Sequence, residues 1–278
     1  VFSHLWLCDA DGSDARQMTD NSSAINAWSF DMEWSGDGSY IVYSSVPSPY
    51  RSKILVRSVV LMEIETGDKR TLIPSGRFAD GLQTSPDGQN ILCAAPRGDE
   101  VAFSSDGLFM VNKNGEMSSD RVLDIDRNVE GARWLDDKRF IALLTDGTSK
   151  SIWVSDLDGN KSKIDIGNVV PNTIRVGKNG DIAIVGTTPH EPVELYYMSS
   201  VEAEMAALTN VNTWADTLAK GKVTTVEWET HDGYKADGVL TYPVGYEKGK
   251  TYPLVLVIHG GPMGSSKTQF RPMALDIA

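Results

Sequence analysis

Residues 33–43, EWSGDGSYIVY, decide the fold because they join an apolar run to a tight polar turn. The same arrangement returns as QTSPDGQNILC at 83–93, RWLDDKRFIAL at 133–143 and RVGKNGDIAIV at 175–185. Asp-Gly or Asn-Gly between alternating apolar residues is a strong β-hairpin signal, because both residue types tolerate the positive φ of a tight turn. Each stretch therefore predicts two antiparallel strands joined by a short turn.

A second hairpin pattern alternates with the first along the chain. Its copies begin at Leu5, Leu61, Leu108, Ser151 and, more faintly, Glu194. One unit thus holds two hairpins, or four strands, in roughly 45–50 residues, which is the period of β-propeller blades. Residues 1–213 supply about four to five such blades. The alternative, an all-β sandwich, also predicts turns but no register of about 50 residues.

The pattern changes after residue 213. Residues 214–222 are predicted to be a linker, and two alternating strands follow at 223–230 and 235–243. The unbroken apolar run Leu254–Ile258 then predicts a strand that is covered on both faces, as in α/β folds. The predicted domains are therefore the propeller blades of 1–213 and a second domain that starts at residue 223 and includes residues 223–278.

The apolar run ends in His259-Gly260-Gly261-Pro262. Glycines directly after a buried strand let the backbone turn sharply and bring N–H groups against a ligand. In α/β-hydrolases the corresponding loop supplies one backbone N–H of the oxyanion hole. A plain glycine-rich turn would explain the Gly-Gly pair alone, but the preceding strand and hairpin together favour a hydrolase.

Residues 221–262, GKVTTVEWETHDGYKADGVLTYPVGYEKGKTYPLVLVIHGGP, resemble the prolyl oligopeptidase family of serine peptidases, nearest its acylaminoacyl-peptidase and dipeptidyl-peptidase branch. Residues 1–213 resemble the family more loosely, since similar hairpins occur in the propeller of the Tol system. The resemblance implies a mainly β chain in which a partial β-propeller is followed by the first strands of an α/β-hydrolase domain. It also implies that the Gly261 N–H, with Gly260 as the alternative, donates to the oxyanion, and that His259 and Pro262 shape the loop.

The nucleophile of this family lies in a G-x-S-x-G motif, and no serine of the chain has that context. We therefore expect no catalytic triad residue within the chain, an inactive fragment, and the Ser, His and Asp beyond Ala278. The resemblance implies that the full-length enzyme hydrolyses short peptides by acyl-enzyme chemistry, releasing dipeptides or an acylated residue. The alternative is a non-catalytic propeller that binds a protein or glycan partner, but such a protein has no need of residues 223–278.

Composition excludes several other classes. Twenty-six basic against 38 acidic residues give a net charge of −12, which would repel a nucleic acid. The longest apolar runs are far too short to span a bilayer. Neither the zinc motif HExxH nor Cys-x-x-Cys nor a phosphate-binding G-x-x-x-x-G-K occurs, so we predict no metal and no cofactor. The chain starts at Val1 without an initiator Met, and a secreted or periplasmic location is slightly favoured over a cytoplasmic one.

Other conspicuous residues receive structural explanations. We expect surface or structural roles for His4, His190 and His231, and buried free thiols at Cys8 and Cys93. Tryptophans recur at equivalent places of the repeats, which predicts packing between blades for Trp6, Trp34, Trp134 and Trp153. Whether an acidic residue between blades, such as Asp99 or Glu100, anchors a substrate amine stays open.

Overall fold

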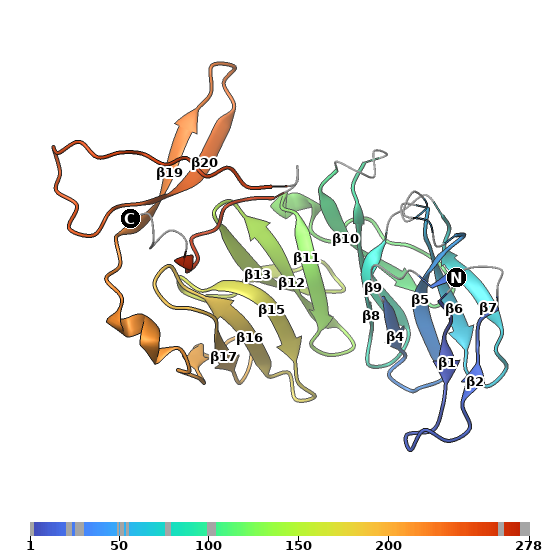
Figure 1. The fold of residues 1–278 in the computed structure, drawn as a ribbon. Coiled ribbons are helices and arrows are strands. Elements are labelled where there is room, and N and C mark those ends of the chain that lie inside the picture. Colours follow the sequence, from blue (N-terminus) through green and yellow to red (C-terminus); the bar gives the residue numbers. More distant parts are fainter. Residues whose placement is uncertain are drawn as a thin grey trace. The chain divides into compact units, whose positions relative to one another are not determined.

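The computed structural model describes residues 3–20, 24–25, 31–48, 50, 53, 56–75, 79–98, 104–260 and 264–272. Strands form most of its regular structure, as Figure 1 shows. The chain divides into two compact units. Unit 1 is Val1–Ala142 with Ser155–Asn160, and unit 2 is Leu143–Val154 with Lys161–Ala278.

The first strands form a short hairpin and two larger antiparallel sheets. The hairpin pairs β1 (Trp6–Leu7) with β2 (Arg16–Gln17). The sheet that we call the first blade consists of β3 (Ala24–Ile25), β4 (Met32–Trp34), β5 (Tyr40–Val46), β6 (Ser58–Glu63) and β7 (Lys69–Ile73). The second blade consists of β8 (Asp80–Thr84), β9 (Asn90–Pro96) and β10 (Asp106–Asn112). A bridge from Val111 to Met117 marks the place of its fourth strand.

Two further sheets have four strands each. After the 3-10 turn η2 (Leu123–Ile125), the third blade consists of β11 (Val129–Trp134), β12 (Arg139–Asp146), β13 (Ser149–Asp156) and β14 (Lys161–Lys163). The fourth blade consists of β15 (Val170–Val176), β16 (Ile182–Thr187), β17 (Glu194–Met198) and β18 (Ala206–Ala207). A 3-10 turn, η3 (Thr213–Thr217), precedes the hairpin of β19 (Val223–Glu229) and β20 (Lys235–Thr241). The prediction of a mainly β chain with two hairpins per repeat is confirmed.

The predicted turns of the first two blades have the same internal hydrogen bonds. In the first, Asp37 Oδ1 accepts from Ser35 Oγ at 2.7 Å and from the Ser39 amide at 3.0 Å. In the second, Asp87 Oδ1 accepts from Ser85 Oγ at 2.6 Å and from the amide two residues further on at 3.0 Å. The Ser39 amide is the main reason that the pKa of Asp37 is lowered to about 2. The Ser-x-Asp-Gly sequence therefore specifies one turn geometry twice.

These two turns also touch each other within unit 1. A Cβ added to Gly36 would lie 1.9 Å from the carbonyl oxygen of Pro86, so only glycine lets the two backbones come this close. The Tyr40 hydroxyl donates to the carbonyl of Gly88 at 2.7 Å. Behind the turns, the facing sheets bury a continuous apolar core that includes Val42, Leu61, Leu82, Ile91 and Val111. Burying one such side chain contributes about 1.5–3 kcal/mol.

The tryptophan and cysteine predictions hold only in part. Trp134 is buried, and its Nε1 donates to the carbonyl of Gln83 at 2.9 Å, as expected for packing between blades. Trp6 and Trp34 are 63% and 49% exposed, so the same prediction is wrong for them. Trp34 is exposed because β4 alternates its side chains, and the strand points that residue away from the core. Cys93 is buried as predicted, whereas Cys8 is exposed.

Candidate functional site

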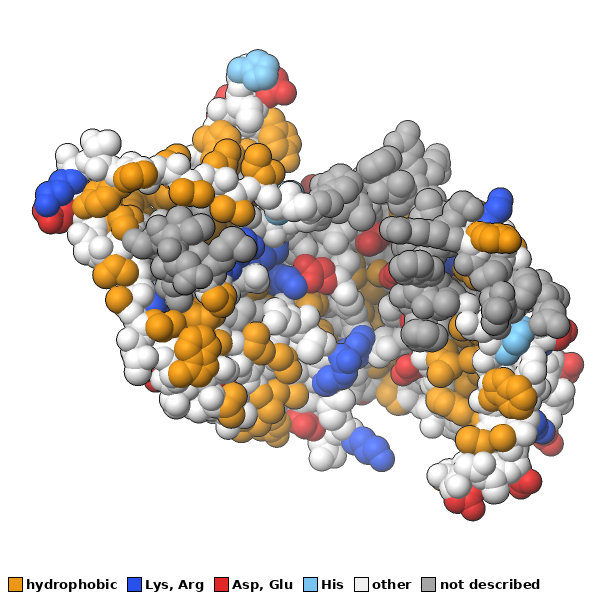
Figure 2. All heavy atoms as spheres, in the orientation of Figure 1, with side chains coloured by type: hydrophobic (Ala, Val, Ile, Leu, Met, Phe, Trp, Pro, Cys, Tyr) orange, Lys and Arg blue, Asp and Glu red, His pale blue; other side chains and the backbone are white. Residues whose placement is uncertain are grey.

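The predicted oxyanion loop follows a segment that does not form the expected strand. Residues 254–258, which we call the apolar segment, have no strand conformation, and their side chains are 57–80% exposed. A strand needs a hydrogen-bonded neighbour, and none of the described strands pairs with this segment. Its course is the dark orange loop of Figure 1, and Figure 2 shows hydrophobic side chains gathered over this part of the surface.

Half of the predicted loop residues fall within the described part of the chain. His259 and Gly260 are exposed, and a Cβ added to Gly260 would meet nothing within 4 Å. Gly261 and Pro262, predicted as oxyanion donor and loop-shaping residue, lie outside the described residues. The roles of all four residues therefore stay predictions.

The hairpin before the loop forms as the sequence predicts. β19 and β20 pair in register from Val223–Thr241 to Glu229–Lys235. In the connecting turn, Gly233 has a φ of +82° and its amide donates to the carbonyl of Thr230 at 2.9 Å. The Thr230 hydroxyl bonds the carboxylate of Asp232, which lowers the pKa of that carboxyl. His231 lies exposed in this turn, so its predicted surface position is confirmed.

The chain after the loop is anchored within unit 2, on the β12–β13 turn and on the end of β16. Lys267 Nζ donates to the carbonyl of Gly147 at 2.6 Å, and the Thr268 amide donates to the carbonyl of Thr148 at 2.8 Å. Two residues further on, the Phe270 amide donates to Thr187 Oγ1 at 3.2 Å. The ring of Phe270 also meets the ring of Trp214 edge to face, with centroids 6.1 Å apart. No local sequence pattern marks these contacts, because the partners are more than 50 positions apart in the chain.

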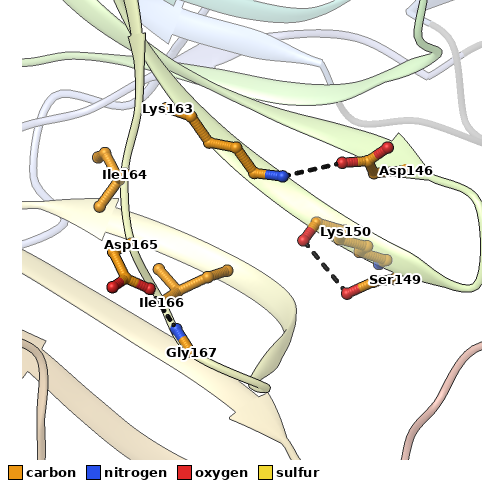
Figure 3. A pocket seen from close by; sticks show the side chains of 8 residues that line it. All are labelled: Asp146, Ser149, Lys150, Lys163, Ile164, Asp165, Ile166 and Gly167. Carbon is orange, nitrogen blue, oxygen red and sulfur yellow. Dashed lines mark hydrogen bonds and ion pairs between the residues drawn. The ribbon is translucent and has the colours of Figure 1, made fainter. Parts of the chain in front are cut away.

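A pocket of about 380 Å³ lies beside the β12–β13 hairpin in unit 2. Figure 3 shows its lining, which comprises Asp146, Ser149, Lys150, Lys163, Ile164, Asp165, Ile166 and Gly167. Lys163 pairs with Asp146 at 3.1 Å, and Asp165 accepts from the amide of Gly167 at 2.9 Å. The only serine of the lining, Ser149, donates its hydroxyl to a neighbouring carbonyl. The lining contains no histidine that could act as a base for this serine. The pocket therefore lacks the constellation for acyl-enzyme chemistry.

Unit 1 contains a second concentration of charge, at the end of the first two blades opposite the Ser-x-Asp-Gly turns. Arg57 is 1% exposed and its guanidinium pairs with Asp80 at 3.0 Å. Burial raises the pKa values of Asp31 and Asp106 to about 6, and that of Asp80 also rises by burial despite the nearby Arg57. Burial lowers the pKa of Arg57 in turn. No sequence motif marks this cluster, since its members come from four separate segments.

Asp31 gives a test of what this cluster does to stability. Its Oδ1 accepts from the amide of Leu82 at 3.1 Å, while its buried Oδ2 has no hydrogen-bond partner among the described residues. Because folding raises this pKa, the folded state binds a proton more tightly than the unfolded state, so stability rises as pH falls through about 6. We expect Asp31→Asn to raise the free energy of unfolding by about 1 kcal/mol at pH 8 and by almost nothing at pH 4, near the ordinary pKa of an aspartate.

Urea unfolding at both pH values measures this difference. Asp37→Asn is the matched control, because folding lowers the pKa of Asp37 and its carboxylate accepts several hydrogen bonds in the turn. The control variant should lose stability at pH 8. If Asp31→Asn and the unchanged chain are equally stable at pH 8, the ionised Asp31 carboxylate does not destabilise the folded state as we expect.

The described ranges contain neither a metal-binding cluster nor a membrane-spanning helix. No group of three or more His, Cys, Asp or Glu side chains there has an arrangement that could hold a metal ion. No helix in that part of the chain has the length and apolar character of a membrane-spanning segment. Asp99 and Glu100, the open candidates for binding a substrate amine, lie outside the described residues.

Solved structures with the same fold include several peptidases. The acylaminoacyl peptidase of Pyrococcus horikoshii is 22% identical, covers 98% of the chain and superposes with a TM-score of 0.74. A puromycin hydrolase is 16% identical over 96% of the chain, with a TM-score of 0.67. The β-propeller domain of the Trilobed protease from Pyrococcus furiosus is 17% identical over 74%, with a TM-score of 0.55. No protein-family model and no curated protein sequence matches the chain.

These likenesses define the fold. The four sheets are blades of a β-propeller of the kind found in peptidases, and the expected resemblance to the prolyl oligopeptidase family is confirmed at the level of fold. The chain spans 41% of the length of the acylaminoacyl peptidase, 42% of the puromycin hydrolase and 61% of the Trilobed protease domain.

Proposed function

We propose that residues 1–278 form propeller blades and the entry into the catalytic domain of a serine peptidase of the prolyl oligopeptidase family. The observation that carries the proposal is the extent of the structural match. The acylaminoacyl peptidase covers 98% of the chain and so includes most of 223–278, whereas the isolated propeller domain covers 74%. A propeller that only binds a protein or glycan would leave the β19–β20 hairpin and the His259–Gly260 loop without a role.

The proposed reaction is hydrolysis of short peptides through an acyl-enzyme, with acylaminoacyl or dipeptidyl substrates. A serine attacks the scissile carbonyl, a histidine takes its proton, and an aspartate orients that histidine. These three groups belong to parts of the peptidase other than residues 1–278, where no serine has the G-x-S-x-G context. The contribution of this chain is a backbone donor, the Gly261 N–H or alternatively that of Gly260, to the tetrahedral oxyanion. Loss of one such donor costs about 10²–10³ in rate.

A fluorophosphonate probe tests the proposal, because it labels only an activated serine nucleophile. We expect it to label the complete gene product at the serine of a G-x-S-x-G motif, and to leave purified 1–278 unlabelled. Acylaminoacyl p-nitroanilides and dipeptidyl p-nitroanilides with a free amine then distinguish the two substrate classes. Labelling of a serine within 1–278 would refute the proposal. The proposal would also be refuted if the complete gene product lacks a G-x-S-x-G motif and hydrolyses neither substrate.

A further inference from the structure

The turn between β12 and β13 contacts the chain on both sides of the His259–Gly260 loop. We infer that this turn, formed by Gly147 and Thr148, sets the position of the loop, and that Lys267 is a positioning residue for oxyanion binding. The catalytic consequence rests on the proposed function, whereas the anchoring itself does not. All the residues involved belong to unit 2.

On the C-terminal side of the loop, two consecutive residues bind the turn. Lys267 is 6% exposed, and its ammonium donates to the carbonyl of Gly147 at 2.6 Å. Thr268 adds its amide at 2.8 Å and its hydroxyl at 3.1 Å, both to the carbonyl of Thr148. Hydrogen bonds from a charged donor are stronger than neutral ones, and a buried ammonium that loses its acceptor is costly. Lys267 is therefore the main attachment of this segment.

On the N-terminal side, both strands of the β19–β20 hairpin meet the same turn. The hydroxyls of Thr148 and Thr225 are hydrogen-bonded at 2.6 Å. Gly147 has a φ of +57°, and a Cβ added there would lie 2.7 Å from a carboxylate oxygen of Asp237. Glycine is thus favoured at this turn by its backbone conformation, and the Asp237 side chain of β20 reaches close to it.

The two described residues of the loop, His259 and Gly260, are exposed. Gly260 has open space where a side chain would be, and the preceding apolar segment forms no strand. The flanking attachments therefore limit where these two exposed residues lie. An oxyanion donor must lie about 2.7–3.1 Å from the developing charge, and a misplacement of about 1 Å can cost on the order of 10²-fold in rate. Loosening the attachment at Lys267 should therefore reduce transition-state binding more than substrate binding.

Hydrogen exchange on the 278-residue chain tests the anchoring without any activity. In Lys267→Met we expect the Thr268 amide to exchange at least about 10-fold faster, while Lys267→Arg keeps most of the protection. Lys250→Met is the matched control, since Lys250 is exposed and pairs only at the surface with Glu247. Thr268→Val keeps the backbone amide and removes one hydroxyl, so it gives a milder variant if Lys267→Met does not fold. Unchanged exchange at Thr268 in both Lys267→Met and Thr268→Val would overturn the anchoring.

Steady-state kinetics of the complete peptidase tests the catalytic consequence. We expect Lys267→Met to lower kcat about 10-fold with KM changed less than 2-fold, Lys267→Arg to restore most of kcat, and Lys250→Met to change neither. If the Thr268 amide exchanges faster but the Lys267→Met and Lys250→Met enzymes have equal kcat, the positioning role of Lys267 is overturned. The anchoring of the segment would still stand. A complete protein that is inactive in its unchanged form would instead refute the proposed function, and the exchange result would still decide the anchoring.

Discussion

Replacing Gly36 by valine is expected to destabilise unit 1 by about 3 kcal/mol. The Cβ would lie 1.9 Å from the carbonyl oxygen of Pro86, a backbone atom that cannot rotate away. Either the two turns separate, which uncovers the core between the first and second blades, or the backbone of the first turn distorts. Urea unfolding followed by tryptophan fluorescence measures the loss.

Gly38→Asn is the control for this variant. Gly38 has a φ of +74°, and a Cβ added there would have nothing within 4 Å. Asparagine tolerates the left-handed conformation better than most residues, so we expect a loss below about 1 kcal/mol. A Gly36→Val chain as stable as the Gly38→Asn chain would show that the close contact with Pro86 does not exist in solution.

The apolar segment is expected to exchange its amide hydrogens far faster than the blades. Amides of Val255 to Ile258 pair with none of the described strands, so they should exchange near the rate of an unstructured peptide. Amides of Ile41 to Tyr43 lie in β5, between β4 and β6, and should exchange at least about 10³-fold more slowly. Mass spectrometry of a dilute, monomeric sample measures both regions in one experiment.

Two further measurements separate exposure from association. An unpaired apolar segment can pair edge to edge with a second chain, so raising the protein concentration should slow its exchange. Replacing the exposed Leu256 by lysine should remove that concentration dependence and raise solubility, without changing the exchange at β5. Slow exchange of Val255 to Ile258 in the dilute sample would mean that the segment forms a strand after all.

The blades could be predicted from the sequence because their determinants are local. Asp37 and Asp87 accept hydrogen bonds from residues two positions away, so the Ser-x-Asp-Gly pattern by itself specifies the geometry of the turn. Side-chain burial was harder to predict. Trp34 and Trp134 occupy the same place in the repeat, yet only Trp134 is buried, with a carbonyl of the preceding blade as its partner. Burial depends on which neighbour is present, and a single repeat does not encode that.

The region after residue 213 was predictable in its parts but not in its assembly. The β19–β20 hairpin forms from its own alternating residues and its Gly233 turn. The run Leu254–Ile258 has the composition of a buried strand, but composition cannot supply the neighbouring strands that such a strand needs. The attachments of Lys267 to Gly147 and of Arg57 to Asp80 were equally invisible, because they join residues that are distant in sequence.

The order of strands within the blades has a consequence for how the protein is made. In the third and fourth blades every strand pairs with the one next to it in the sequence, from β11 to β14 and from β15 to β18. Such pairings close short loops, which costs little chain entropy and favours rapid folding. Each blade can therefore assemble soon after its own residues leave the ribosome, supported by the blade already in place. By the time the apolar segment is synthesised, the strands of the blades are already paired with one another.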